Sequence, residues 1–173
     1  MIAQSLKKIL LAVSFLCLFG YTNHAFGQSN IKIQVSVIEK LSPDKFKDHE
    51  GTFYSVNIDM FNNTDSIIKF WTMYVWQVNW ISNTKELHLY MPNNIDQDYS
   101  LIQQIDSGQK ITLKGEIYVL GTLKDIQKKN FKLGFIFIEK KEANSMNNFL
   151  RLLVKKRKEG KDIIWSEPFK ITR

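Results

Sequence analysis

The residue types that perform most enzyme chemistry are sparse in this chain. Its 173 residues include three histidines and one cysteine, Cys17, which lies inside an apolar run over 9–19. His49 lies in the charged stretch Lys47-Asp48-His49-Glu50, and His88 alternates with Leu87 and Leu89. A zinc site usually needs about three or four Cys, His or carboxylate ligands. The sequence therefore predicts no metal site, a loop position for His49, and a strand-surface position for His88.

Other catalytic patterns are equally scarce. The sequence contains no G-x-S-x-G nucleophile elbow, and its glycines form neither a P-loop nor a dinucleotide fingerprint. The closest local carboxylate pair is Asp96-Gln97-Asp98, which could serve a glycosidase or share a calcium ion. A good calcium site wants about six to eight oxygens, so a solvated loop is favoured. We expect a protein that is not an enzyme and that has no cofactor.

The aromatic residues give the best indication of a binding surface. If residues 70–80 form one regular strand, one face carries Phe70, Tyr74, Trp76 and Trp80, and the other carries Trp71, Met73 and Val75. Each sheet of a sandwich has one inner face, so one set lies outside unless a loop or a partner covers it. Three interpretations stay open: buried core, a protein interface, or a platform for sugar rings. The candidate ligand or partner residues are Tyr74, Trp76, Trp80 and His88.

The first 27 residues follow the order of a secretory signal peptide. Lys7 and Lys8 form a positive region, residues 9–19 form the apolar run, and Ala25-Phe26-Gly27 offers small residues for cleavage. The run is shorter than the roughly 20 residues of a membrane span, and Phe15-Leu16 before Cys17 does not make a lipobox. We expect a signal peptide over 1–27, cleavage near Gly27-Gln28, and an exported protein, periplasmic or extracellular, with no stable membrane span after cleavage.

The remaining residues, 28–173, suit a single domain. Cleavage would remove Cys17, so the exported chain would have neither a disulfide nor a thiol nucleophile. Without Lys7 and Lys8, the 24 Lys and Arg residues fall by two against 17 Asp and Glu, which leaves a net charge of about +5. This mild basic balance is compatible with an anionic surface such as lipid headgroups or acidic glycans. Nucleic acid is a poor partner for a protein that leaves the cytoplasm.

Period-two alternation of apolar and polar residues dominates the exported chain. It covers residues 31–37, 54–60, 111–119 and 131–137, and shorter strands are expected near 87–91, 101–105 and 163–165. Turn residues separate them at Asn62-Asn63-Thr64-Asp65 and at Asp106-Ser107-Gly108-Gln109. The stretch 66–81 has apolar residues at both odd and even positions. This fits a central strand covered on both sides or two strands joined by a bend. The pattern predicts an all-β antiparallel sandwich of about seven to nine strands.

One segment has helical spacing instead. Met146, Phe149, Leu150 and Leu153 form a stripe with helical period, Ser145 or Asn144 can cap it, and Gly160 can end it. We predict a short helix near 145–157, with a hairpin strand over 150–156 as the alternative. The densest cluster of charges in the chain is Lys155 to Lys158 with Lys161. Both the helix and the hairpin would place this cluster at a solvated end. The other interpretation of this charge is electrostatic docking to an acidic surface.

Three pieces of this layout resemble a known group of proteins. They are the strand ending in Asn62-Asn63-Thr64-Asp65 before an apolar strand, Ile105-Asp106-Ser107-Gly108-Gln109 before an alternating strand, and the terminal Ile163-Ile164-Trp165-Ser166-Glu167-Pro168. The layout resembles small exported immunoglobulin-like β-sandwich proteins of Bacteroidetes-type bacteria. That resemblance implies an immunoglobulin-like fold and a location in the cell envelope, and it carries over no catalytic residues.

We therefore expect an exported, non-catalytic β-sandwich with a binding or assembly role in the bacterial envelope, whose partner is a protein or a glycan. Its edge strands and its aromatic surface would make the contacts. The first alternative is a glycan-binding module that uses an exposed aromatic strand face. The second is a hydrolase whose acid site is assembled by the fold.

Overall fold

Antiparallel strands make up most of the described structure. The computed structural model describes residues 31–42, 51–73, 76–90 and 100–172, and residues Ile31–Arg173 form one unit. The predicted signal peptide, with Cys17, lies outside the described residues. In the described part nine strands are paired, all of them antiparallel, which confirms the predicted all-β sandwich. The strands are β1 (Ile31–Lys40), β2 (Thr52–Asn62), β3 (Ile68–Met73), β4 (Trp80–Ser82), β5 (Leu87–Tyr90), β6 (Ser100–Ile105), β7 (Lys110–Val119), β8 (Leu133–Ile136) and β9 (Ile163–Trp165).

The first layer is a four-stranded sheet in the order β1-β2-β7-β5. Its central strand β2 shows why the alternation was informative, since Tyr54, Val56, Ile58 and Met60 are buried while the residues between them are partly exposed. These side chains point into a core shared with the second layer. One face of this sheet is therefore covered by protein.

The second layer consists of two small sheets, β3-β6 and β4-β8-β9. They meet where the Trp71 amide donates to the Ile138 carbonyl at 2.9 Å, next to an isolated bridge between Phe70 and Glu139. All four residues of β8 are buried. Leu133 and Phe135 belong to the core shared with the first layer, whereas Ile136 belongs to a second apolar cluster on the opposite face.

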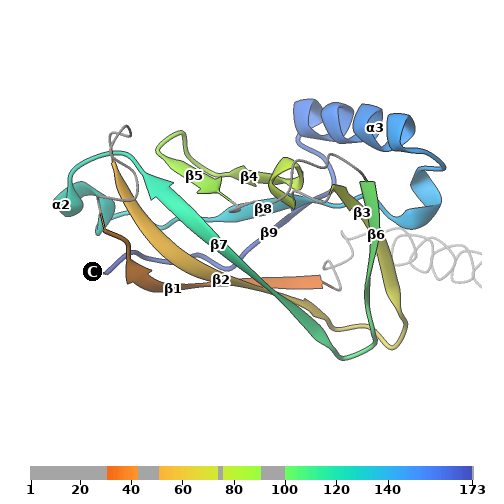
Figure 1. Ribbon diagram of the computed structural model, residues 1–173, viewed down its shortest axis with the longest axis horizontal. Helices are drawn as coiled ribbons and strands as arrows, with labels where there is room; N and C mark the ends of the chain where they lie inside the picture. The colour runs from red at the N-terminus through yellow and green to blue at the C-terminus, as the bar shows by residue number, and fades with distance from the viewer. Residues whose placement is uncertain (1–30, 43–50, 74–75, 91–99, 173) are drawn as a thin grey trace, which may run out of the picture. The chain divides into compact units, whose positions relative to one another are not determined.

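Helix α3 (Met146–Glu159) covers that opposite face (Figure 1). Its Phe149 and Leu153 pack with Met73, Ile136 and Ile138. The Ser145 side chain caps the first turn by accepting from the Asn148 amide, and Gly160 ends the helix with a φ of 65°, which glycine adopts without strain. The predicted helix is confirmed and the hairpin alternative is wrong. A short helix α2 (Leu123–Ile126) and two 3₁₀ turns, η2 (Trp76–Asn79) and η3 (Lys140–Glu142), complete the described elements.

Two long strand pairs join the layers at a corner. Figure 1 shows β2 and β7 running side by side and continuing past a bend into β3 and β6. The buried side chain of Asn62 holds this bend, because its Nδ2 donates to the carbonyls of Ser66 at 2.8 Å, Ile105 at 2.9 Å and Asp106 at 3.2 Å. Its Oδ1 accepts from the amide and the hydroxyl of Thr64. The predicted turns at 62–65 and 106–109 therefore meet at one polar clamp.

Candidate functional site

Residues 70–80 do not form one regular strand. Strand β3 ends at Met73, η2 occupies Trp76–Asn79, and β4 begins at Trp80, so two strands joined by a bend is the correct alternative. The buried side chain of Asn79 holds the bend. Its Nδ2 donates to the carbonyls of Trp71 at 3.3 Å and Ile136 at 3.1 Å, and its Oδ1 accepts from the Thr72 hydroxyl.

The described members of the predicted aromatic set, Phe70, Trp76 and Trp80, share one face, and that face is turned toward the core. Trp80 is 5% exposed and meets Phe135 edge to face at 5.0 Å, so it is a core residue. Trp76 is half-buried and packs against the same core, with Phe70 at 5.8 Å. Tyr74 lies outside the described residues. In the described part, therefore, Trp76 and Trp80 do not form an open platform, because both pack against the core shared with the first layer.

The opposite set of aromatic residues is covered from within the chain. Trp71 stacks on Phe149 of α3, with ring centroids 6.0 Å apart, and its Nε1 donates to the carbonyls of Lys140 and Ala143 at 3.1 Å each. This explains how a strand can carry apolar side chains on both of its faces. The first layer covers one of its faces and the helix covers the other.

His88 is on the solvent face of β5, as predicted, because its neighbours Leu87 and Leu89 are buried. It lies opposite Tyr118 of β7, with ring centroids 5.7 Å apart, and Tyr118 stacks in turn on Phe53 of β2 at 4.8 Å. These rings form a row across three strands. The sequence did not reveal Tyr118 as a member of this row, because its neighbours come from strands distant along the chain and depend on the register.

Among the described residues, no cluster of three or more His, Cys, Asp or Glu side chains could hold a metal ion. His49, Asp96 and Asp98 lie outside the described part of the chain, so the structure does not place them. None of the helices in residues 31–172 that the structure describes is long and apolar enough to span a membrane.

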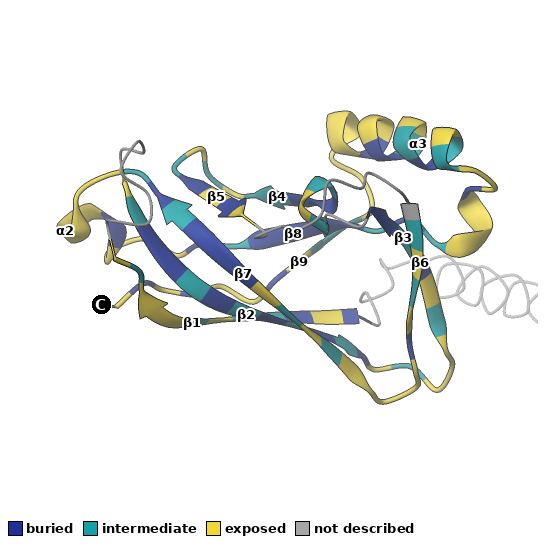
Figure 2. Ribbon diagram, in the orientation of Figure 1, coloured by how far each residue is buried: buried dark blue, intermediate teal, exposed yellow. Residues whose placement is uncertain are grey.

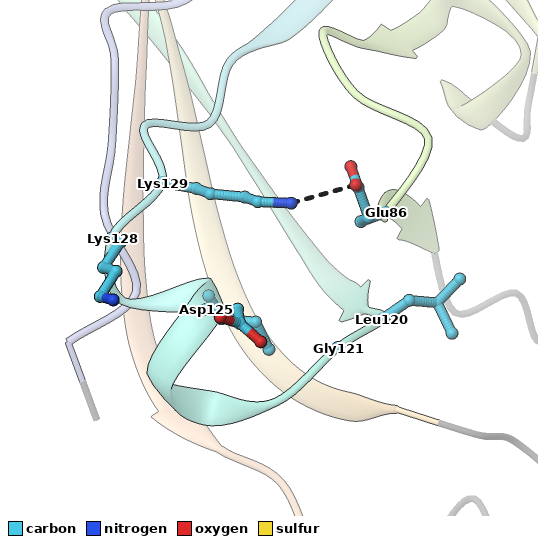
Figure 3. A pocket seen from close by; sticks show the side chains of 7 residues that line it. Glu86, Leu120, Gly121, Asp125, Lys128 and Lys129 are labelled. Carbon is cyan, nitrogen blue, oxygen red and sulfur yellow. Dashed lines mark hydrogen bonds and ion pairs between the residues drawn. The ribbon is translucent and has the colours of Figure 1, made fainter.

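A hollow of about 420 Å³ lies beside α2 (Figure 3). Lys129 crosses it to pair with Glu86 at 3.0 Å. This hydrogen bond is the main reason that the pKa of Glu86 is lowered. Glu86 is thus an ionised partner and a poor general acid. The Asp125 carboxylate accepts from the Thr122 hydroxyl that caps α2. The described lining offers no histidine, cysteine or hydroxyl nucleophile; its residues are Glu86, Leu120, Gly121, Asp125, Ile126, Lys128 and Lys129.

The outer edge of β6 offers unpaired backbone groups in the described structure. The Trp71 amide points to Ile138, so the next residues along β3, Phe70 and Thr72, point toward β6. Their partners in register are Gln103 and Leu101. The N–H and C=O groups of the alternate residues, Ile102 and Gln104, therefore point away from β3.

This edge lacks the protection that is seen at the edge strand β1 of the larger sheet. Strand β6 reads SLIQQI and has no charged side chain, and its Ile102 is 43% exposed. Edge strand β1 carries Lys32, Glu39 and Lys40 and an irregularity between Val37 and Glu39. The Glu167 amide also caps its Ile33 carbonyl. Charges and bulges of this kind prevent strand addition in natural sheets, so β6 is better suited than β1 to receive a strand. The residues 91–99 before it are outside the described part.

Comparisons with known proteins do not assign a function. No protein-family profile and no curated protein matches the chain. Among solved structures, it is similar to the crystal structure of a FixG-related protein from Vibrio parahaemolyticus, with 9% sequence identity and a TM-score of 0.37. The match covers 84% of this chain and 99% of that chain. A likeness this distant does not transfer a function.

Proposed function

We propose that this protein is an exported, non-catalytic β-sandwich of the immunoglobulin-like kind, which binds another protein in the bacterial envelope by accepting a strand at the edge of β6. One observation carries this proposal: the outward backbone groups of Ile102 and Gln104 on an uncharged strand. Edge pairing of this sort is a recurring mode of peptide recognition, in which main-chain hydrogen bonds give affinity and alternate side chains give specificity.

The geometry defines the chemistry of the partner segment. Two outward residues offer about four backbone hydrogen bonds, one donor and one acceptor each. The exposed Ile102 side chain lies beside its cross-strand neighbour Trp71, so an apolar residue of the added strand would find an apolar neighbour there. Because β6 has no charge, an uncharged extended segment fits better than a charged one.

The decisive variant is Ile102→Pro. Proline removes the outward N–H of residue 102 but leaves the β3–β6 hydrogen bonds intact, since those belong to Leu101 and Gln103. Ile102→Val is the matched control, because it keeps the N–H and an apolar side chain. With a photo-crosslinking amino acid at position 104 in the producing cell, we expect one specific protein adduct that Ile102→Val retains and Ile102→Pro loses.

Amide hydrogen exchange gives an independent check in the purified protein. The N–H groups of Ile102 and Gln104 should exchange quickly, and those of Leu101 and Gln103 should be protected. Slow exchange at residues 102 and 104 would show that the edge is already paired, and the proposal would then fail. So would an adduct that is unaffected by Ile102→Pro.

A glycan site is the second candidate, and the row His88–Tyr118 is the observation that favours it. His88 is exposed, and Tyr90, two residues along the same strand, is 46% exposed. Flat rings on a sheet face suit stacking with sugars, although cross-strand aromatic pairs also stabilise sheets by themselves. On a glycan array, combined His88→Ala and Tyr90→Ala should weaken binding by about ten-fold. If Trp76→Ala weakens it equally, or no glycan binds, this site is excluded.

A further inference from the structure

The solvent side of α3 carries positive charge that nothing in the described structure neutralises. Arg151, Lys155 and Lys158 follow one another at helical spacing, so they lie on one face, with Val154 beside them at 63% exposure. Figure 2 shows the outward side of α3 mostly in the colour of exposed residues. At a rise of about 1.5 Å per residue, the three charges span roughly 10 Å along the helix. None of the three makes an ion pair among the described residues.

Neighbouring charges of the helix are used internally. Lys156 is buried and pairs with Glu142 at 2.6 Å and Asp162 at 3.2 Å. Glu159, the acid of the exposed side, pairs with Lys161 at 3.3 Å. The outward stripe therefore presents cations without the interspersed acids that are common on a solvated helix.

Helix stability explains only part of this arrangement. Cations in the last turn interact favourably with the helix dipole, which accounts for Lys158. Arg151 lies in the middle of the helix, beyond the reach of that effect. The apolar side of the helix is fixed on β8 and β3 by Phe149 and Leu153, so the basic stripe is held rigidly outward.

We propose that this basic face of α3, defined by Arg151, Lys155 and Lys158, adsorbs to the anionic headgroups of a lipid membrane. A straight row of cations matches a flat, diffuse negative surface, and each Lys or Arg near such a surface strengthens binding by about five-fold. The row carries no aromatic ring on which a sugar would stack. Val154 adds a small apolar contact at its centre. The adsorption is weak, reversible and salt-sensitive, and it does not depend on the edge of β6.

Vesicle co-sedimentation tests the proposal with the purified protein. Vesicles of phosphatidylcholine with about one third phosphatidylglycerol should bind it at low salt, pure phosphatidylcholine should not, and about 1 M salt should release it. The triple variant Arg151→Gln, Lys155→Gln and Lys158→Gln should bind about 100-fold more weakly, since three contributions of about five-fold are lost. Glutamine is a good helix former, so circular dichroism should confirm an unchanged fold.

A matched variant separates position from net charge. Lys40→Gln, Lys114→Gln and Lys128→Gln remove the same charge from exposed positions of β1, β7 and the segment after α2. This control should retain most of the vesicle binding. An equal loss in both triple variants would show a non-specific effect of net charge and would overturn the proposal. Failure to bind anionic vesicles, with retention on a soluble acidic polysaccharide or polyglutamate, would overturn it in favour of a different class of partner.

Discussion

The clamp made by Asn62 should decide the stability of the corner that presents β6. The side chain is 1% exposed, and it makes three hydrogen bonds through Nδ2 and two through Oδ1. In Asn62→Ala all five are lost. Each buried hydrogen bond contributes about 0.5–1.5 kcal/mol net, and water can replace those near the exposed turn. We expect a loss of about 3 kcal/mol in the free energy of unfolding, or a fall of about 10 °C in Tm.

The assay is urea denaturation followed by tryptophan fluorescence, with Asn63→Ala as the matched control. Asn63 is the next residue in the chain and is exposed, so its substitution should change stability by less than about 0.5 kcal/mol. If the two alanine variants were equally stable, Asn62 would not act as a clamp and the account of the corner would be wrong.

Asn62→Asp extends the same prediction to pH. The new carboxylate would face the carbonyl oxygens of Ser66, Ile105 and Asp106 in a buried position, which raises its pKa in the folded state above the unfolded value of about 3.9. The folded protein then favours the protonated acid. The stability deficit relative to the wild type should be smallest below about pH 4 and grow as the pH rises through the folded pKa. A deficit that is independent of pH would refute this.

Two further predictions concern charged contacts. Lys156→Met should lower stability by about 2 kcal/mol in urea denaturation, because the Phe137 carbonyl loses its 3.0 Å donor, while Glu142 and Asp162 remain open to water. A stabilised variant would show that desolvation of the lysine outweighs its contacts. The hydrogen bond from Lys110, followed by that from Thr112, lowers the pKa of Asp59. Its contribution, under about 1 kcal/mol, should therefore be present above the unfolded pKa of about 3.9 and disappear as the pH falls through the lower folded pKa. Denaturation curves of Asp59→Asn and the wild type should converge at low pH.

Local chemistry made much of the fold predictable. Alternation located strands such as β2 and β7, and turn residues located the bends at Asn62 and Gly108. The cap at Ser145, the apolar stripe and the stop at Gly160 located α3. Each of these signals acts between residues that are close along the chain, which is why a single sequence reveals them.

The bend between β3 and β4 was harder to predict, because its cause is not local. Asn79 holds it through carbonyls of Trp71 and Ile136, and the second comes from a strand more than fifty residues away. The row of His88 and Tyr118 depends on register in the same way. A stretch with apolar residues at both odd and even positions could not distinguish an exposed aromatic face from one covered by a helix of the same chain.

The helix changes where a binding surface should be sought. With α3 on one side and the first sheet on the other, the apolar side chains of β3 and β8 are satisfied within the chain. A partner that binds the apolar face of β3 would have to displace Phe149 from Trp71. Among the groups that the described chain leaves available are the backbone groups of Ile102 and Gln104 and the unpaired cations of α3. A search of the sequence for aromatic or catalytic residues finds neither of them. A strand edge depends on which strands pair, and a basic face depends on whether acidic side chains lie close enough to neutralise its cations.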